Sequence, residues 1–138
     1  MEWYLKVMKQ YADFSGRARR KEYWMFTLMY MVIIFAIYFL GIAALAFSPV
    51  ILMIVFGLVI LFSLAHIIPS LAVTVRRLHD TGRSGWWFLI GFIPLIGPLV
   101  MLVFLCTDSS PGRNEWGPNP KDPDDDGEFF EDVIDDMV

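Results

Sequence analysis

Two histidines and a cluster of basic residues are the side chains of this sequence that could do chemistry. His66 lies inside a long uncharged run, where an ionisable side chain suggests a proton relay or a ligand site. Ser63 and Ser70 share its helical face by their spacing of three and four residues. A single histidine without a carboxylate partner makes a poor relay, so we expect a structural role. In that role, neutral His66 hydrogen-bonds a backbone carbonyl freed by Pro94 or Pro98.

The second histidine, His79, stands beside Asp80, and such a pair could exchange protons with a substrate. Adjacent residues on a helix point about 100° apart, and no nucleophile or metal ligand accompanies this pair. We therefore expect a salt bridge between Asp80 and a nearby arginine, with His79 at the membrane interface.

Basic residues gather in two stretches that flank apolar runs. They are Arg17, Arg19, Arg20, Lys21, Arg76, Arg77 and Arg83. A basic residue near a membrane surface attracts anionic headgroups by about 1 kcal/mol, and the planar guanidinium group suits phosphate recognition. The alternative is that these residues only retain their loops in the cytoplasm and extend to the interface.

No pattern in the sequence marks a catalytic, metal or cofactor site. Cys106 is the single cysteine, which excludes an internal disulfide and a cysteine-based metal site. The run Asp-x-Asp-x-Asp-Gly at 122–127 resembles the start of an EF-hand loop, but Val133 stands where a bidentate glutamate is required. We expect a protein that is not an enzyme and binds no cofactor.

The composition is that of a membrane protein. Of 138 residues, 57% are apolar and 19% are charged, and a soluble domain this short cannot bury so much apolar surface. The charges are also segregated. Residues 1–107 carry nine Lys or Arg and four Asp or Glu, whereas residues 108–138 carry two and eleven. The body is therefore basic and the tail acidic, and we expect contact with anionic lipid and none with nucleic acid.

Three uncharged runs are long enough to cross about 30 Å of hydrocarbon at 1.5 Å per residue. They cover about residues 24–47, 50–73 and 86–106. Ser48 and Pro49 separate the first two runs, and proline favours the first turn of a helix, so we predict a tight helical hairpin. The predicted fold class is an all-α membrane protein with about three transmembrane helices.

The third run is interrupted by Pro94, Gly97 and Pro98. We predict one crossing helix that is bent at Pro94 and Pro98. The alternative is a re-entrant hairpin that returns to the side where it began, which would move the C-terminus across the membrane.

The remaining segments flank a transmembrane domain over residues 17–107. Aromatic and apolar residues of the segment 1–16 fall on one helical stripe, which predicts a short helix lying in the headgroup plane. The first 22 residues contain no apolar core of a cleavable signal peptide. The segment 75–85 is predicted to be a polar connector. Residues 108–138 are rich in Pro, Gly and Asp, which favours a largely disordered tail.

The positions of the basic residues predict the orientation. They flank the first run and lie between the second and third runs, while the turn between the first two runs has none. The positive-inside rule then places the N-terminus and the connector in the cytoplasm. Three crossings would leave the C-terminus on the periplasmic or extracellular side.

Three ordered motifs are similar to those of a known family. The stretches FSGRARRKEYW (14–24), RRLHDTGRSGWW (76–87) and GRNEWGPNP (112–120) resemble the bacterial inner-membrane family known as domain of unknown function 805. The resemblance spans about residues 10–120. It implies a multi-pass protein of the bacterial inner (plasma) membrane without an established activity, and it supplies no catalytic residues.

These features favour a non-enzymatic membrane protein that self-associates or binds a membrane protein partner, with a basic cytoplasmic face on anionic lipid. A small channel or transporter with a path near His66 is the alternative. A membrane enzyme acting on lipid phosphates is the third hypothesis.

Overall fold

The computed structural model describes residues 1–45 and 48–122, and these residues form helices and turns without a β-strand. The elements in chain order are α1 (Glu2–Lys9), α2 (Arg20–Leu45), α3 (Pro49–Asp80), the 3₁₀ helix η1 (Gly85–Phe92) and α4 (Ile96–Cys106). The predicted all-α fold class is confirmed.

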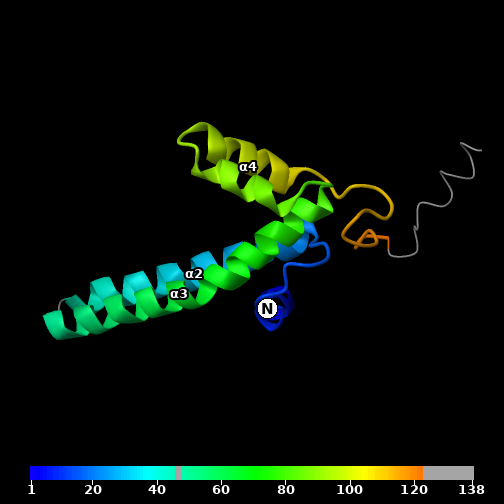
Figure 1. Cartoon of the computed structure of the whole chain (residues 1–138). Coiled ribbons are helices and arrows are strands. Elements are labelled where there is room, and N and C mark those ends of the chain that lie inside the picture. The colour runs from blue at the N-terminus through cyan, green and yellow to red at the C-terminus, as the bar shows by residue number, and fades with distance from the viewer. Residues whose placement is uncertain (46–47, 123–138) are drawn as a thin grey trace, which may run out of the picture.

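Helices α2 and α3 form the long hairpin expected for the first two apolar runs, and both are long and apolar enough to cross a membrane (Figure 1). Ser48 caps α3, because its hydroxyl accepts a hydrogen bond from the Val50 N–H at 3.2 Å, and Pro49 occupies the first turn. The two helices approach closely at Gly41, where an added Cβ would lie 2.9 Å from a methyl carbon of Val55.

Helix α3 is longer than a bilayer requires. Its 32 residues extend over about 48 Å at 1.5 Å per residue, compared with about 30 Å of hydrocarbon. Residues 75–80 of the segment expected as a polar connector (75–85) belong to α3, and only a short loop separates Asp80 from η1. The end of the helix tolerates its charged residues because partners from other segments neutralise them, as described below.

The third apolar run does not form one crossing helix. The chain turns back at Ile93–Leu95, where Leu95 adopts a φ of 66°, and η1 and α4 pack against each other as a second, shorter hairpin. Close contact requires Gly97, since a Cβ there would lie 2.0 Å from the Ile90 carbonyl oxygen. The expected helix bent at Pro94 and Pro98 is corrected: these residues belong to a helical hairpin, which was the alternative.

Both ends of this shorter hairpin lie beside the same end of α3. Gly85, where it begins, is close to Val75, because a Cβ on Gly85 would lie 2.7 Å from a Val75 methyl carbon. Leu105, near its end, accepts a hydrogen bond from the Arg77 side chain at 3.1 Å. The hairpin therefore leaves the polar end of α3 and returns to it.

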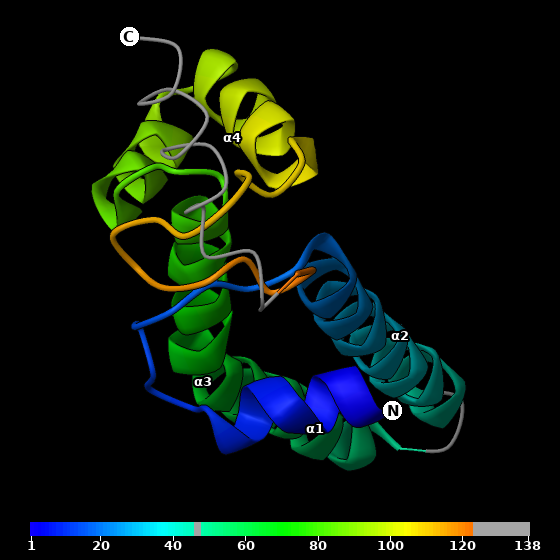
Figure 2. The same ribbon diagram turned by 90° about the vertical axis from the view of Figure 1, so that its right-hand side faces the viewer.

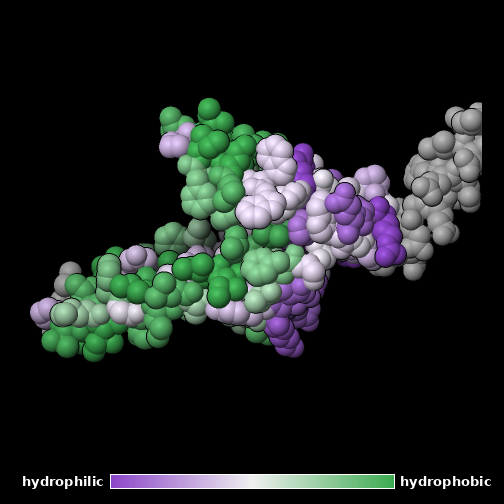
Figure 3. Space-filling view, in the orientation of Figure 1, coloured by the Kyte–Doolittle hydropathy of each residue, from purple (hydrophilic) through white to green (hydrophobic). Residues whose placement is uncertain are grey.

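The molecule has two apolar arms and one polar end. In Figure 1 the two hairpins diverge from a common junction, and Figure 3 shows hydrophobic side chains covering the arms while hydrophilic ones gather around the junction. Helix α1 lies across the long hairpin near this end (Figure 2). Its Val7 is buried against Phe26 of α2 and Val73 of α3.

The segment after α4 packs against the junction and is not helical. The Ser110 N–H donates to the Asp80 carbonyl at 2.8 Å, and Arg17 donates to the Gly112 carbonyl at 2.8 Å. The part of the expected disordered tail that the structure describes, through residue 122, is thus held in place. The acidic remainder, with its EF-hand-like run, lies outside the described residues.

These contacts place the described C-terminal segment at the same end of the molecule as the residues that precede α2. The turn at Pro94 removes the third crossing on which the expected position of the tail depended. The side of the membrane on which each terminus lies stays a prediction.

A substitution at Gly97 tests this second hairpin. Gly97→Ala should lower the thermal unfolding temperature in detergent, because the new methyl group overlaps the Ile90 carbonyl, and overpacking of this kind costs about 1–3 kcal/mol. Gly57→Ala is the matched control, since a Cβ at Gly57 meets nothing within 4 Å. Circular dichroism melting of both variants measures the difference. An unfolding temperature for Gly97→Ala that is equal to that of the control would contradict the hairpin.

Candidate functional site

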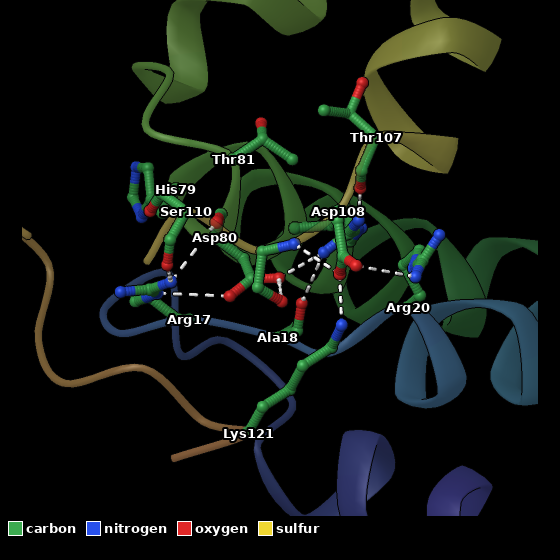
Figure 4. A network of polar contacts seen from close by, with 12 residues as sticks. Arg17, Ala18, Arg20, His79, Asp80, Thr81, Thr107, Asp108, Ser110 and Lys121 are labelled. Atoms are coloured by element: carbon green, nitrogen blue, oxygen red, sulfur yellow. Dashed lines mark hydrogen bonds and ion pairs between the residues drawn. The ribbon is translucent and has the colours of Figure 1, made fainter. Parts of the chain in front are cut away.

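The polar end of the molecule is built around one buried carboxylate. Asp80 is fully buried at the end of α3, and its Oδ1 accepts a hydrogen bond from Arg17 Nε at 3.1 Å. Arg77, one turn earlier, pairs with Oδ2, and the Ser109 hydroxyl donates to the same oxygen at 2.6 Å. Figure 4 shows Arg17, Asp80 and Ser110, which come from three separate segments, close together at this end. We call this cluster the charged junction.

The two arginines also satisfy backbone carbonyls. Arg17 donates to the carbonyls of Ser110 at 2.6 Å and Gly112 at 2.8 Å. Arg77 donates to those of Leu105 and Thr107, at the C-terminal end of α4, where carbonyls lack intrahelical partners. The positive charge of Arg77 also suits the negative end of the α4 dipole. The junction therefore ties the ends of α3 and α4 and the segment before α2 together.

A second buried carboxylate, Glu22, lies beside the junction on α2 and was not singled out from the sequence. Its side chain is 1% exposed, and it pairs with Lys6 of α1 at 2.5 Å and with Arg76 at 3.3 Å. Arg76 also donates to the Gln10 side chain. Two guanidinium nitrogens of Arg76, Nε and Nη2, are buried without a hydrogen-bond partner among the described residues. This cluster fixes α1 against the long hairpin.

Three of the seven basic residues expected at the membrane surface are inside the protein. The side chains of Arg17, Arg76 and Arg77 are at most 3% exposed, and all three pair with buried carboxylates. They are paired with Asp80 and Glu22, partners that the sequence does not show. Headgroup contact stays a prediction for the basic residues that are exposed.

The other four basic residues are more open. Arg20 pairs with Asp108 at 3.0 Å with 43% of its side chain exposed, and Lys21 is exposed. Arg19 is partly buried, and Arg83 places its guanidinium 4.2 Å from the centre of the Phe104 ring.

The exposed Asp108 carboxylate holds two further contacts. Lys121 and the Ser109 N–H donate to it, and these hydrogen bonds lower the pKa of Asp108 below its ordinary value. The pair with Lys121 holds the last described residues against the start of the post-α4 segment.

His79 and Asp80 point to different partners and do not form an acid–base pair. Asp80 makes the expected salt bridges with arginines, whereas the His79 ring stacks on Trp116 with centroids 4.4 Å apart and planes at 7°. His79 Nδ1 lies 3.3 Å from the Gly16 carbonyl oxygen, and Asn114 donates to the His79 carbonyl at 2.9 Å. His79 is thus buried at the junction.

His66 is enclosed by aromatic rings and is satisfied on both nitrogens. Its Nδ1 lies 2.8 Å from the Phe62 carbonyl oxygen, which can only accept, so Nδ1 carries the proton. Its Nε2 lies 2.6 Å from the Tyr4 hydroxyl of α1. The expected carbonyl near Pro94 or Pro98 is not its partner, because those residues belong to the other hairpin.

The surroundings of His66 do not form a polar path. The residue is 3% exposed, and the rings of Phe62 and Tyr30 have centroids 4.0 and 5.3 Å from its own. Within the described residues, neither Ser63 nor Ser70 hydrogen-bonds His66; the carbonyl of Ser70 instead accepts from Thr74. The contact with Tyr4 places His66 beside α1.

The turn that follows α1 supplies a hydrogen-bond donor to the α3 backbone next to His66. Pro69 has no N–H to donate to the carbonyl of Ala65, four residues earlier. The Tyr11 hydroxyl donates to that carbonyl at 2.7 Å instead. The sequence contains two signals from which this contact could have been predicted: Pro69 inside an apolar run, and Tyr11 in the aromatic N-terminal segment.

Replacing the central carboxylate tests the charged junction. Asp80→Asn keeps the shape but leaves Arg17 and Arg77 as uncompensated buried charges, a loss of about 3–5 kcal/mol of stability. Asp108→Asn is the control, since its carboxylate is 58% exposed and surface pairs contribute at most about 1 kcal/mol. Denaturant unfolding in detergent, followed by circular dichroism, measures both. Equal effects of the two substitutions would contradict a stabilising role for the buried charges.

Comparisons with known proteins match nearly the whole described chain. The family model described as "Protein of unknown function (DUF805)" matches residues 11–118. Inner membrane protein YhaI of Escherichia coli strain K12 is 48% identical over 121 residues, which are 88% of this chain and 97% of that protein. Inner membrane protein YhaH of the same strain is 45% identical over 125 residues, which are 88% and 98% of the two chains. No solved structure matches.

The three motifs that resemble this family are the segments that meet at the charged junction. Arg17, Asp80 and Gly112 come from the first, second and third motif, and all lie within the matched range. Three motifs that are far apart in the sequence are therefore brought together at one site in the structure. The chain belongs to the DUF805 family, whose function is unknown and whose relatives YhaI and YhaH are inner membrane proteins.

Proposed function

We propose that this protein is a non-enzymatic membrane scaffold that binds a second copy of itself through its apolar hairpins and anionic lipid through its basic surface. The observation that carries the proposal is the charged junction. Asp80 pairs there with Arg17 and Arg77, Glu22 pairs beside it with Arg76, and the two apolar arms meet at this one polar end. What the molecule presents outward is therefore apolar helix surface and a limited set of free cations.

An enzyme acting on lipid phosphates has less support. Such an enzyme needs cations free to hold a phosphate group, whereas Arg17, Arg76 and Arg77 are buried in ion pairs. A channel near His66 likewise has less support, because aromatic rings enclose that residue. Binding through surfaces is the class of function that the exposed residues favour.

The apolar arms support self-association. Phe39 on α2 and Met53 on α3 are each 75% exposed, and Leu95 at the tip of the shorter hairpin is 85% exposed. The hairpins diverge, so neither arm covers the other (Figure 1). Helices in a membrane associate through van der Waals packing of such surfaces, which a second copy can supply.

The basic surface of α1 and the start of α2 supports lipid contact. Lys6, Lys9 and Lys21 are exposed, and Lys6 and Lys21 lie 5.6 and 5.9 Å from the centre of the Trp3 ring. A tryptophan beside lysines on an amphipathic helix is typical of the headgroup region. By the positive-inside rule this surface faces the cytoplasm, together with the described segment after α4.

Energy transfer between labelled copies tests self-association. Cys106 is exposed, and as the single cysteine it accepts one donor or acceptor dye without further substitution. We expect transfer between copies in vesicles to persist when the vesicles are diluted with excess lipid. Transfer that falls in proportion to the dilution would contradict binding between copies.

The same donor tests lipid contact when the acceptor is placed on a lipid headgroup. Transfer to an anionic lipid should exceed transfer to a zwitterionic one, because each basic residue contributes about 1 kcal/mol. The double substitution Lys9→Gln and Lys21→Gln should remove most of this preference, whereas Arg113→Gln, an exposed cation of the post-α4 segment, should change it little. No preference in the unmodified protein would contradict the lipid contact.

A further inference from the structure

A groove lies between α3 and η1, in the angle where the two hairpins meet. Its volume is about 560 Å³, within the range of about 300–1,000 Å³ typical of sites for small ligands. Leu71 and Val75 line it on α3, Leu89 and Phe92 line it on η1, and Phe14 borders it from the segment before α2. These walls are apolar. The groove therefore suits a hydrocarbon chain.

The groove changes from apolar to polar along its length. Leu71, Val75 and His79 follow one face of α3 at intervals of four residues toward the charged junction. On the other wall, η1 runs in the opposite sense, from Ser84 at the junction to Phe92 in the arm. One end of the groove is thus formed by His79 and Ser84, and the other end is formed by aliphatic and aromatic side chains. This is the polarity of a single-chain lipid.

The polar end offers one hydrogen-bond acceptor. His79 is 8% exposed and lines the groove, and its Nδ1 lies 3.3 Å from the Gly16 carbonyl oxygen. Because a carbonyl only accepts, Nδ1 carries the proton, and in the neutral ring Nε2 keeps a free lone pair. Within the described residues, Nε2 has no hydrogen-bond partner. Stacking on Trp116 holds the plane of the ring.

The polar end also offers one donor. The Ser84 oxygen accepts from the Trp86 N–H at 3.4 Å, which leaves its hydroxyl hydrogen available. Gly85 separates the two groups, and a Cβ there would lie 3.5 Å from His79 Nε2 and 2.7 Å from a Val75 methyl carbon. The missing side chain keeps this end of the groove open beside the imidazole.

We propose that this groove binds one free single-chain lipid whose head is a hydroxyl or an un-ionised carboxyl group. The head O–H donates to His79 Nε2 and its oxygen accepts from Ser84, while the hydrocarbon chain follows Val75, Leu89 and Phe92 into the arm. No carboxylate or lysine lines the groove, and the nearby Arg83 already donates to the Thr81 carbonyl and stacks on Phe104. The site therefore recognises a neutral head and not a phosphate.

Photolabelling of the full chain in vesicles tests the site. The probe is hexadecanol carrying a diazirine near the end of its chain, and peptide mass spectrometry locates the label. We expect label on the apolar end of the groove, at Leu89 and Phe92. Leu89→Trp, which fills the groove, should reduce this label at least roughly fivefold, whereas Leu58→Trp should leave it unchanged. The two leucines are 52% and 54% exposed, so the pair is matched.

A second pair of measurements tests the head group. The alcohol probe should label the groove more strongly than a diazirine alkane that lacks the hydroxyl group. We expect a difference of roughly five- to tenfold in labelling, the effect of about one hydrogen bond. His79→Phe keeps a ring for stacking on Trp116 and should abolish this preference. If that variant does not fold, as judged by circular dichroism, the Leu89 and Leu58 pair decides alone. Label spread over α2 and α3 in proportion to exposure, or equal labelling of the two tryptophan variants, would overturn the proposal.

Discussion

A carboxylate removed from water must be paired, and this requirement organises the molecule. Asp80 is fully buried at the end of a long apolar helix; two arginines neutralise it, and the Ser109 hydroxyl donates a hydrogen bond to it. The arginines in turn need acceptors for their remaining N–H groups. They find them in backbone carbonyls, so each charge also fixes a piece of chain.

The shorter hairpin depends on this arrangement. An apolar helix that stops inside a protein leaves its last carbonyls without partners, and the end of α4 has this problem at Leu105 and Thr107. Arg77 donates to both carbonyls. Arg77 therefore both pairs with Asp80 and binds the C-terminal end of α4, where the shorter hairpin ends. This coupling explains why the two arms share one polar end and diverge elsewhere, and why the groove between them closes at His79.

The sequence predicts those parts of the fold that follow from local pattern. The two uncharged runs, with Ser48 and Pro49 between them, specify the long hairpin, because helix length and capping depend on neighbouring residues. The turn at Pro94 is ambiguous from sequence, since proline and glycine allow either a bend or a reversal. The structure shows a reversal, in which Gly97 packs closely against Ile90, and a contact between these two residues cannot be read from the sequence.

The residues of the candidate site could be predicted only in part. Arg17, Arg76 and Arg77 are recognisable as a basic cluster, but pairing with Asp80 and Glu22 joins residues more than fifty positions apart for two of them.

The central claim is that the charged junction brings the segment before α2 and the segment after α4 to one side of the membrane. Spin labels at Ser15→Cys and Arg113→Cys, in a Cys106→Ser background, report this directly, because both positions are exposed and adjoin contacts of Arg17 with Asp80 and Gly112. Double electron–electron resonance of the protein in vesicles should give a narrow distance distribution well below the roughly 30 Å thickness of the hydrocarbon core. A separation of about 40 Å or more, the thickness of a whole bilayer, would place the two segments on opposite sides and contradict the account.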